Sequence, residues 1–331
     1  MKTAIIFGVS GQDGAFLSHL LLKKNYRVVG VSRDIRKTSF SNLHLLNVCN
    51  DIELISTSML DFDAMLRVMK RTRPDEIYDL SGQSSVALSF EEPVETYESI
   101  SIANMNLLEV LRRVDSPVKF FNAGSSDCFG NANGHAASET SPFNPRSPYA
   151  VAKSSACFQT ANYREAYHLF ACTGILFNHE SFLRPEKFVT RKIVNTACRI
   201  AAGSNEKLVL GNIAIERDWG WAPEYVKAMW LMLQQKTPED YIIATGITCS
   251  LEQFISAVFK TLNLEWKEHV VTDIKFMRPT DVKVVRANPA KAATKLGWKA
   301  VYSTCDVAKM MVEAELETSK PKVTTNRNQT I

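Results

Sequence analysis

Short apolar runs alternate with amphipathic segments along the first half of the chain. Residues 3–7 form an apolar run that ends at a glycine, and residues 15–24 have helical spacing that puts Phe16, Leu20 and Leu21 on one face. Proline at 93 and at 148 stands where it favours the start of a helix. The alternation predicts strands at 27–31, 52–55, 76–80, 119–123 and 170–177, and helices at 62–71, 93–113 and from 148 onward.

The second half of the chain is less regular. Helical patterns are interrupted there by short strand-like runs, such as those at 208–210 and 241–244. From about residue 319 the chain is polar, which is typical of a disordered tail. The helices predicted in this half lie at 190–202, 223–234, 251–262, 289–296 and 306–317.

Repeating strand–helix units imply a parallel sheet with helices on both faces. The predicted fold class is therefore α/β, a Rossmann-like doubly wound parallel sheet with a smaller C-terminal α/β substrate lobe. We expect residues 1–175 to form the cofactor-binding domain, with later segments contributing to it. Residues 176–318 are expected to form mainly the substrate-binding lobe, and 319–331 the disordered tail.

A glycine fingerprint lies between the first predicted strand and the first predicted helix. Three glycines spaced three apart allow the backbone to approach a pyrophosphate, and the helix N-terminus supplies N–H groups and positive potential. A glycine-rich turn that binds nothing is the alternative interpretation. The predicted cofactor residues in this segment are Gly8, Ser10, Gly11, Gln12, Asp13 and Gly14.

Tyr149 and Lys153 stand four residues apart, so they lie on one face of the predicted helix. An ammonium group beside a phenol favours the phenolate, which would make the tyrosine an acid/base near neutral pH. Taken alone, the pair is equally compatible with an exposed helix face. Together with a dinucleotide, which would supply hydride chemistry, it predicts an oxidoreductase-type active site.

The end of the second predicted strand bears on the choice between NAD and NADP. An acidic residue there would bind a ribose 2′-hydroxyl and repel a 2′-phosphate. The chain has Ser32 at that position, followed by Arg33, Arg36 and Lys37. These residues predict NADP, with Arg33 as the phosphate partner. Asp34 would oppose a phosphate if it pointed inward, and an exposed charged loop is the alternative.

Composition limits the other classes of function. The chain has 331 residues, 45% hydrophobic and 22% charged, which indicates a globular protein with a large core. A net charge of +4 is too small to require nucleic acid. Seven scattered cysteines without ligand spacing predict reduced thiols, a cytoplasmic location and no metal site. No run approaches the ~20 apolar residues of a membrane helix.

Several longer motifs carry a resemblance to a known family. The glycine fingerprint, the Tyr149/Lys153 pair and Ser125-Ser126-Asp127 resemble the extended short-chain dehydrogenase/reductase superfamily. Within it the chain resembles the GDP-mannose 4,6-dehydratases over residues 2–317. The motifs that carry this narrower resemblance are GQDG at 11–14, PFNPRSPY at 142–149, NHES at 178–181, FVTRK at 188–192, RDWG at 217–220 and RPT at 278–280.

The resemblance implies a bound NADP, a GDP-sugar substrate and an internally redox-neutral dehydration of GDP-mannose to GDP-4-keto-6-deoxy-mannose. It implies that Ser125, Asp127, Tyr149 and Lys153 are catalytic. Gln83 and His179 are expected at the cofactor, although Gln83 is also compatible with a loop amide. The implied substrate residues are Ser84, Ser126, Asn178, Arg184, Val189, Lys192, Arg217 and Arg278. A homodimer through two long helices, or a homotetramer, is also implied.

Two of the catalytic positions depart from the family pattern. Ser125 stands where the family usually has Thr, and Asp127 where it has Glu, which withdraws the carboxylate by ~1.5 Å. A related nucleotide-sugar reductase or epimerase, which uses the same Tyr/Lys pair without elimination, is therefore the alternative hypothesis. Glu180 is expected in an ion pair, with a role as a second acid/base as the alternative.

Overall fold

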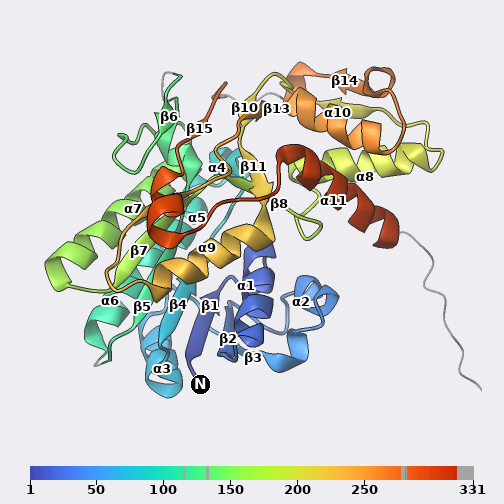
Figure 1. Cartoon of the computed structure of the whole chain (residues 1–331). Coiled ribbons are helices and arrows are strands. Elements are labelled where there is room, and N and C mark those ends of the chain that lie inside the picture. The colour runs from blue at the N-terminus through green and yellow to red at the C-terminus, as the bar shows by residue number, and fades with distance from the viewer. Residues whose placement is uncertain (115, 132–133, 277–279, 281, 319–331) are drawn as a thin grey trace, which may run out of the picture.

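The computed structural model describes residues 1–114, 116–131, 134–276, 280 and 282–318 (Figure 1). Its main sheet has seven parallel strands in the order β12-β7-β5-β4-β1-β2-β3, as the Rossmann-like prediction requires. The predicted tail at 319–331 lies outside the described residues. The strands are β1 (Thr3–Phe7), β2 (Arg27–Ser32), β3 (Glu53–Ser56), β4 (Glu76–Asp79), β5 (Lys119–Ser125), β7 (Ala171–Leu176) and β12 (Tyr241–Ile243).

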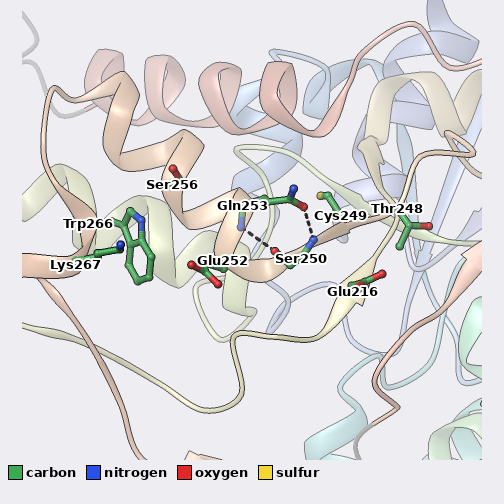
Figure 2. Close-up of a pocket in the computed structure, with 9 residues that line it drawn as sticks. All are labelled: Glu216, Thr248, Cys249, Ser250, Glu252, Gln253, Ser256, Trp266 and Lys267. Atoms are coloured by element: carbon green, nitrogen blue, oxygen red, sulfur yellow. Dashed lines mark hydrogen bonds between the residues drawn. The ribbon is translucent and has the colours of Figure 1, made fainter.

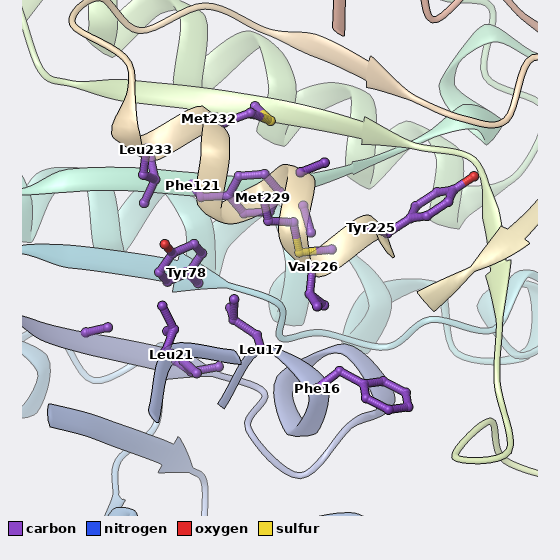
Figure 3. Close-up of a cluster of buried hydrophobic side chains, with 14 of the residues drawn as sticks. Phe16, Leu17, Leu21, Tyr78, Phe121, Tyr225, Val226, Met229, Met232 and Leu233 are labelled. Carbon is purple, nitrogen blue, oxygen red and sulfur yellow. The ribbon is translucent and has the colours of Figure 1, made fainter. Parts of the chain in front are cut away.

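Helices cover both faces of this sheet because successive strand residues point to opposite sides. In β1, Ala4 and Ile6 pack toward α1 (Gln12–Lys23) and α9 (Ala222–Gln234). Figure 3 shows side chains of these two helices meeting Tyr78 and Phe121 of the sheet. Ile5 and Phe7 face the opposite layer, which contains α3 (Phe62–Thr72), α6 (Ala103–Arg113) and α7 (Pro148–Tyr167).

Part of the second half of the chain builds a smaller lobe with its own apolar core. Helices α8 (Val189–Ala201), α10 (Leu251–Thr261) and α11 (Thr304–Thr318) pack together around Trp219. Short strands form two-stranded pairs around this lobe and beside the main sheet: β8 (Asn178–Glu180) with β11 (Trp219–Trp221), β9 (Leu208–Leu210) with β14 (Val270–Thr272), β10 (Glu216–Arg217) with β13 (Cys249–Ser250), and β6 (Ala136–Ala137) with β15 (Arg286–Ala287).

Most predicted elements are confirmed, with differences where helices change pitch or are very short. The predicted helix at 93–113 is α5 (Pro93–Tyr97), a π turn at Glu98–Ile102, and α6. The predicted helix at 289–296 reduces to a π turn at Ala292–Leu296. Two helices that the pattern did not predict, α2 (Ser41–Leu45) and α4 (Val86–Glu91), are too short to show a helical repeat. Single 3₁₀ turns occur at Cys49–Asp51, Ser126–Phe129, Trp266–Glu268 and Ile274–Phe276.

The strand order reverses direction between β1 and β4, which defines a switch point at the carboxyl edge of the sheet. Ligands of open α/β sheets bind in the crevice outside such a point. The glycine segment follows β1, and β5 ends at Ser125 on the same edge. Among the described residues, every helix is too short or too polar to cross a membrane.

Candidate active site

The glycine segment makes a tight turn in which an added side chain would collide with neighbouring backbone. Gly8 has φ +78°, and a Cβ there would lie 2.5 Å from the carbonyl oxygen of Leu80. A Cβ on Gly14 would lie 2.4 Å from the carbonyl oxygen of Gly8. Gly11 is the N-cap residue of α1 and offers no side-chain cap, so the first N–H groups of the helix face outward from the turn. This cradle suits a pyrophosphate.

The charged loop after β2 is held by its own hydrogen bonds. The hydroxyls of Ser32 and Thr38 lie 2.6 Å apart, and the Asp34 carboxylate accepts a bond from the Arg36 backbone N–H at 3.0 Å. Asp34 is therefore occupied within the loop. The Arg33 side chain is 82% exposed and 3.5 Å from Glu95. Arg36 and Lys37 are exposed too. Positive charge thus lies at the surface of this loop.

The predicted catalytic groups Ser125, Asp127 and Tyr149 lie together at the carboxyl end of β5. The Ser125 hydroxyl oxygen accepts a bond from the Asp127 backbone N–H at 3.2 Å, and it lies 3.4 Å from an Asp127 carboxylate oxygen. The same hydroxyl hydrogen-bonds with the phenol of Tyr149. Tyr149 also senses the charge of Asp127. The Asp127 residue is half-buried, and its carboxylate lies close enough to the phenol for its charge to act on it.

Helix α7 brings Tyr149 and Lys153 to this edge because Ser147 caps its N-terminus. The Ser147 hydroxyl oxygen accepts a bond from the Ala150 N–H at 3.1 Å, and Pro148 occupies the first turn. Lys153 is buried and donates to the carbonyl oxygen of Ala123 at 2.9 Å. Burial lowers the pKa of Lys153 despite the opposing charge of Asp79.

The expectation of a lowered Tyr149 pKa beside Lys153 is wrong. Burial raises the pKa of Tyr149 well above its ordinary value, and the negative charge of Asp127 raises it further. These effects outweigh the lowering by the Ser125 hydrogen bond. Tyr149 is accordingly a neutral phenol at neutral pH, and it needs added positive charge before it can act as a base.

The start of α1 is tied to β8 by four polar side chains. Gln12 donates to the carbonyl oxygen of His179 at 3.1 Å and accepts from the Ser181 hydroxyl at 2.7 Å. The His179 ring contacts the Phe177 carbonyl oxygen through Nδ1 at 2.7 Å and the Asp13 carboxylate through Nε2 at 2.9 Å. The side chains of Gln12 and Asp13 therefore point toward β8, which leaves their backbone N–H groups for the predicted cofactor contact.

Two of the predicted substrate residues lie on or just after β8. Asn178 begins the strand and is half-buried, and Arg184 lies just beyond its end. The buried Glu180 carboxylate is 3.3 Å from Arg184 and accepts from the Thr190 hydroxyl at 2.7 Å. This confirms the ion-pair interpretation of Glu180. The Arg184 guanidinium lies 3.8 Å over the ring of Phe188.

Three more of the predicted substrate residues lie in the lobe. Val189 begins α8, and Lys192 in the same helix donates to the Val209 carbonyl oxygen at 2.7 Å. Arg217 in β10 is buried and donates to the Glu216 carbonyl oxygen at 2.8 Å. Lys192 and Val209 line a groove of about 610 Å³. Arg278 lies outside the described residues.

The loop after β4 contains Gln83 and Ser84. The Gln83 amide donates to the Ser85 carbonyl oxygen at 2.8 Å and to the Thr96 hydroxyl at 3.1 Å, and it accepts from the Ser85 N–H. The Gln83 side chain is thus hydrogen-bonded to Ser85 and Thr96. Ser84 is exposed, whereas Ser126 is buried beside Asp127. Their predicted contacts with cofactor and substrate stay predictions.

A second groove, of about 650 Å³, lies at the start of α10 (Figure 2). Figure 2 shows the reciprocal bonds between Ser250 and Gln253 that cap this helix. The residues lining it are Glu216, Thr248, Cys249, Ser250, Glu252, Gln253, Ser256, Trp266 and Lys267. The groove is separate from the catalytic cluster, since no predicted site residue lines its described part.

Three contacts in the site were not predicted from the sequence. Asn42 donates to the Ser10 carbonyl oxygen at 3.1 Å and so supports the glycine turn. Asp79 at the end of β4 is buried, accepts from the Ser81 hydroxyl at 2.6 Å and senses the charge of Lys153. The Asp13–His179 contact joins residues 166 positions apart. No local pattern in the sequence signals any of these pairings.

Comparison with known proteins connects this site with one family. A family model described as GDP-mannose 4,6 dehydratase matches residues 5–311. The chain is 42% identical to GDP-mannose 4,6 dehydratase 1 of Arabidopsis thaliana, over 96% of this chain and 91% of that protein.

Two solved structures share the fold at lower identity. The dTDP-glucose 4,6-dehydratase of Bacillus anthracis, solved with NAD, has a TM-score of 0.83 and 17% identity, and the match covers 96% of this chain and 97% of that one. RMD of Pseudomonas aeruginosa, complexed with NADPH, has a TM-score of 0.81 and 20% identity, and the match covers 96% and 100%.

Proposed function

The chain belongs to the GDP-mannose 4,6 dehydratase family, and we propose that it converts GDP-mannose to GDP-4-keto-6-deoxy-mannose by removing water. One structural observation carries this proposal most directly. Ser125, Asp127 and Tyr149 converge at the carboxyl end of β5, on the sheet edge that also bears the glycine turn. A hydroxyl, a carboxylate and a phenol are the groups that oxidation at C4 followed by elimination at C5 and C6 requires.

The cofactor we propose is a nicotinamide dinucleotide held by the glycine turn, and specifically NADP. The turn suits a pyrophosphate because it is tight and leads directly into the N-terminus of α1; a Cβ on Gly8 or Gly14 would collide with neighbouring backbone. The exposed Arg33, next to Ser32 at the end of β2, is the proposed partner of the 2′-phosphate. When bound, the nicotinamide supplies a reversible hydride acceptor and, in its oxidised form, a positive charge that favours the Tyr149 phenolate.

We assign the protein groups the following proton transfers. The Tyr149 phenolate oxygen takes the proton of the sugar 4-hydroxyl, while the Ser125 hydroxyl holds the same oxygen as it becomes a ketone. The ketone acidifies the C5 proton, which the Asp127 carboxylate removes. The C6–oxygen bond then breaks, and the hydroxyl leaves as water with the proton that Asp127 removed from C5. When the hydride returns to C6, the Tyr149 phenol gives its proton to C5. Lys153 keeps the phenol side of the site positively charged.

The substrate residues we propose are Ser84, Ser126, Asn178, Arg184, Val189, Lys192, Arg217 and Arg278. Guanidinium and ammonium groups suit a diphosphate, and Arg binds it bidentately. In this proposal residues 1–175 bind mainly the cofactor and residues 176–318 mainly the GDP-sugar. Support comes from the groove beside Lys192 and from the contacts that tie β8 to α1.

Assembly and location are part of the same proposal. Val94 and Tyr97 of α5 and Val151, Phe158 and Tyr167 of α7 are apolar yet exposed, with Phe158 63% exposed. Helices α5 and α7 contact each other, so these side chains favour a homodimer through this pair of helices or a homotetramer. All seven cysteines are free thiols, which favours the cytoplasm.

Product mass tests the dehydration. With GDP-mannose we expect a product lighter by one water, and Asp127→Asn should abolish its formation while NADPH still binds. Asp127→Glu, which extends the carboxylate by ~1.5 Å, should retain or raise turnover. A wild-type product of unchanged mass would contradict dehydration and favour the reductase or epimerase. Retained dehydration in Asp127→Asn would place the base on another residue.

A further inference from the structure

The contact between His179 and Asp13 has a chemical consequence that neither residue shows alone. Nδ1 of His179 lies 2.7 Å from the Phe177 carbonyl oxygen, and Nε2 lies 2.9 Å from an Asp13 carboxylate oxygen. A carbonyl oxygen and an ionised carboxylate can only accept hydrogen bonds. Each ring nitrogen must therefore carry a hydrogen, so His179 is an imidazolium wherever Asp13 is ionised.

The surroundings of the pair support the charged form. Burial disfavours both charges, and it alone would lower the pKa of His179 and raise that of Asp13. Their mutual attraction outweighs burial, so the pKa of His179 is raised and that of Asp13 is lowered. Arg184 is the other charged group that acts on both, and the neutral Tyr225 ring stacks on the imidazole at a centroid distance of 4.6 Å.

Asp13 occupies an unfavourable position for a cofactor helix. It lies in the first turn of α1, directly after the glycine turn. A carboxylate in a first turn suits an empty helix N-terminus, but it repels the phosphates that the glycine turn is shaped to hold. An isolated carboxylate there would weaken cofactor binding.

We propose that His179 is the counter-ion of Asp13: its protonated ring neutralises the carboxylate, so the glycine turn can receive dinucleotide phosphates while β8 stays fastened to α1. The proposal rests on the proposed function only in that a dinucleotide occupies the turn. His179 is then unable to act as a general base, because neither ring nitrogen has a free lone pair. The pair positions the cofactor instead of moving protons.

The hydrogen bonds between α1 and β8 also hold residues of the proposed substrate site in place. Gln12 holds residues on both sides of Glu180, through the His179 carbonyl oxygen and the Ser181 hydroxyl. Strand β8 begins at Asn178, and Arg184 follows it. The cofactor turn and the proposed GDP-sugar residues are therefore connected through hydrogen bonds that begin at the first turn of α1.

The protonation state is tested without substrate. Protein labelled with ¹⁵N-histidine gives ring nitrogen shifts by NMR, and the His179 signal is identified by its loss in His179→Gln. At pH 8 we expect His179 to show two protonated ring nitrogens. Asp13→Asn should make His179 neutral at pH 8, and Asp61→Asn, which removes a carboxylate that caps α3, should leave it protonated. A neutral wild-type His179 would overturn the proposal.

NADPH binding tests the consequence by a double-mutant comparison. His179→Gln removes the hydrogen-bonded counter-charge of Asp13 and leaves only the charges of Arg184 and Lys153 to act on it, so the Kd for NADPH should rise on the order of tenfold. Adding Asp13→Asn to that variant should restore most of the affinity. Affinity of the wild type should fall as pH rises through the raised pKa of His179, whereas Asp13→Asn should show a flat profile. A double variant as weak as His179→Gln would overturn the counter-ion role.

The two proposals fail separately. If His179 is protonated and the double variant recovers NADPH binding, the counter-ion role stands even where GDP-mannose gives no dehydrated product. If GDP-mannose is dehydrated but His179 is neutral at pH 8, only the counter-ion role falls.

Discussion

Gly130→Ala should damage the turn that carries Asp127. Gly130 ends the 3₁₀ turn Ser126–Phe129 with φ +56° and ψ −130°, a conformation open almost only to glycine. A Cβ at this position would lie 1.9 Å from the Asn144 carbonyl oxygen, so the backbone of one segment must move. The Asn144 N–H donates to the Cys128 carbonyl oxygen at 2.8 Å, which ties that segment to the catalytic turn.

The cost has two parts. The disallowed backbone conformation costs about 1–3 kcal/mol. Displacement of packed backbone costs about 1–3 kcal/mol more. We therefore expect Gly130→Ala to lower the free energy of unfolding by about 2–6 kcal/mol, and to lower kcat because Asp127 shifts relative to Tyr149.

The assay is urea unfolding of purified protein followed by tryptophan fluorescence, with turnover measured on the same samples. Gly134→Ala is the matched control, since Gly134 has φ +83° but nothing within 4 Å of its added Cβ. It should cost only about 1 kcal/mol and leave kcat unchanged. Equal stability of the two variants would refute the reasoning, because it would show that the turn relaxes without strain.

Three further predictions concern single side chains. Tyr149→Phe should lower kcat on the order of 10²–10⁴-fold with little change in the Kd of GDP, because only the proton carrier is lost; steady-state kinetics that retain activity within tenfold would exclude Tyr149 from the chemistry. Arg33→Ala should raise the Kd for NADPH about tenfold and leave that for NADH unchanged, as measured by fluorescence titration, and equal loss for both would remove the 2′-phosphate role. Burial raises the pKa of Asp218 to about 6, so the buried carboxylate destabilises the fold increasingly as pH rises from about 4 to 6. The melting temperature of Asp218→Asn relative to wild type should therefore rise over that interval, by the equivalent of up to about 3 kcal/mol. A difference that stays constant with pH would contradict the raised pKa.

The sequence predicts much of the fold because its strand signals are local. The apolar run of β1, the glycine turn and the start of α1 are contiguous, and Pro148 marks the start of α7. The pattern could not predict changes of helical pitch, or contacts between residues that are far apart in the sequence. The π turn inside the helix beginning at Pro93 spans only five residues, too few to show a repeat of its own in the spacing.

The candidate site shows the same limit. The types of the catalytic residues are readable from their motifs, but their electrostatic environment is not. The direction of the Tyr149 pKa was predicted wrongly because burial, which no spacing reveals, raises it, and the nearby charge of Asp127 acts in the same direction. The proton on His179 depends on Asp13 and on the Phe177 carbonyl oxygen, and the first of these is far away in the sequence.

The central claim is that one hydrogen leaves C4 and returns to C6 of the same sugar while water is lost. GDP-mannose deuterated at C4 tests it most directly, with the product examined by mass spectrometry and NMR. We predict a product that has lost one unlabelled water and carries the deuterium at C6. A product without deuterium at C6, or one that retains the elements of water, would contradict the account.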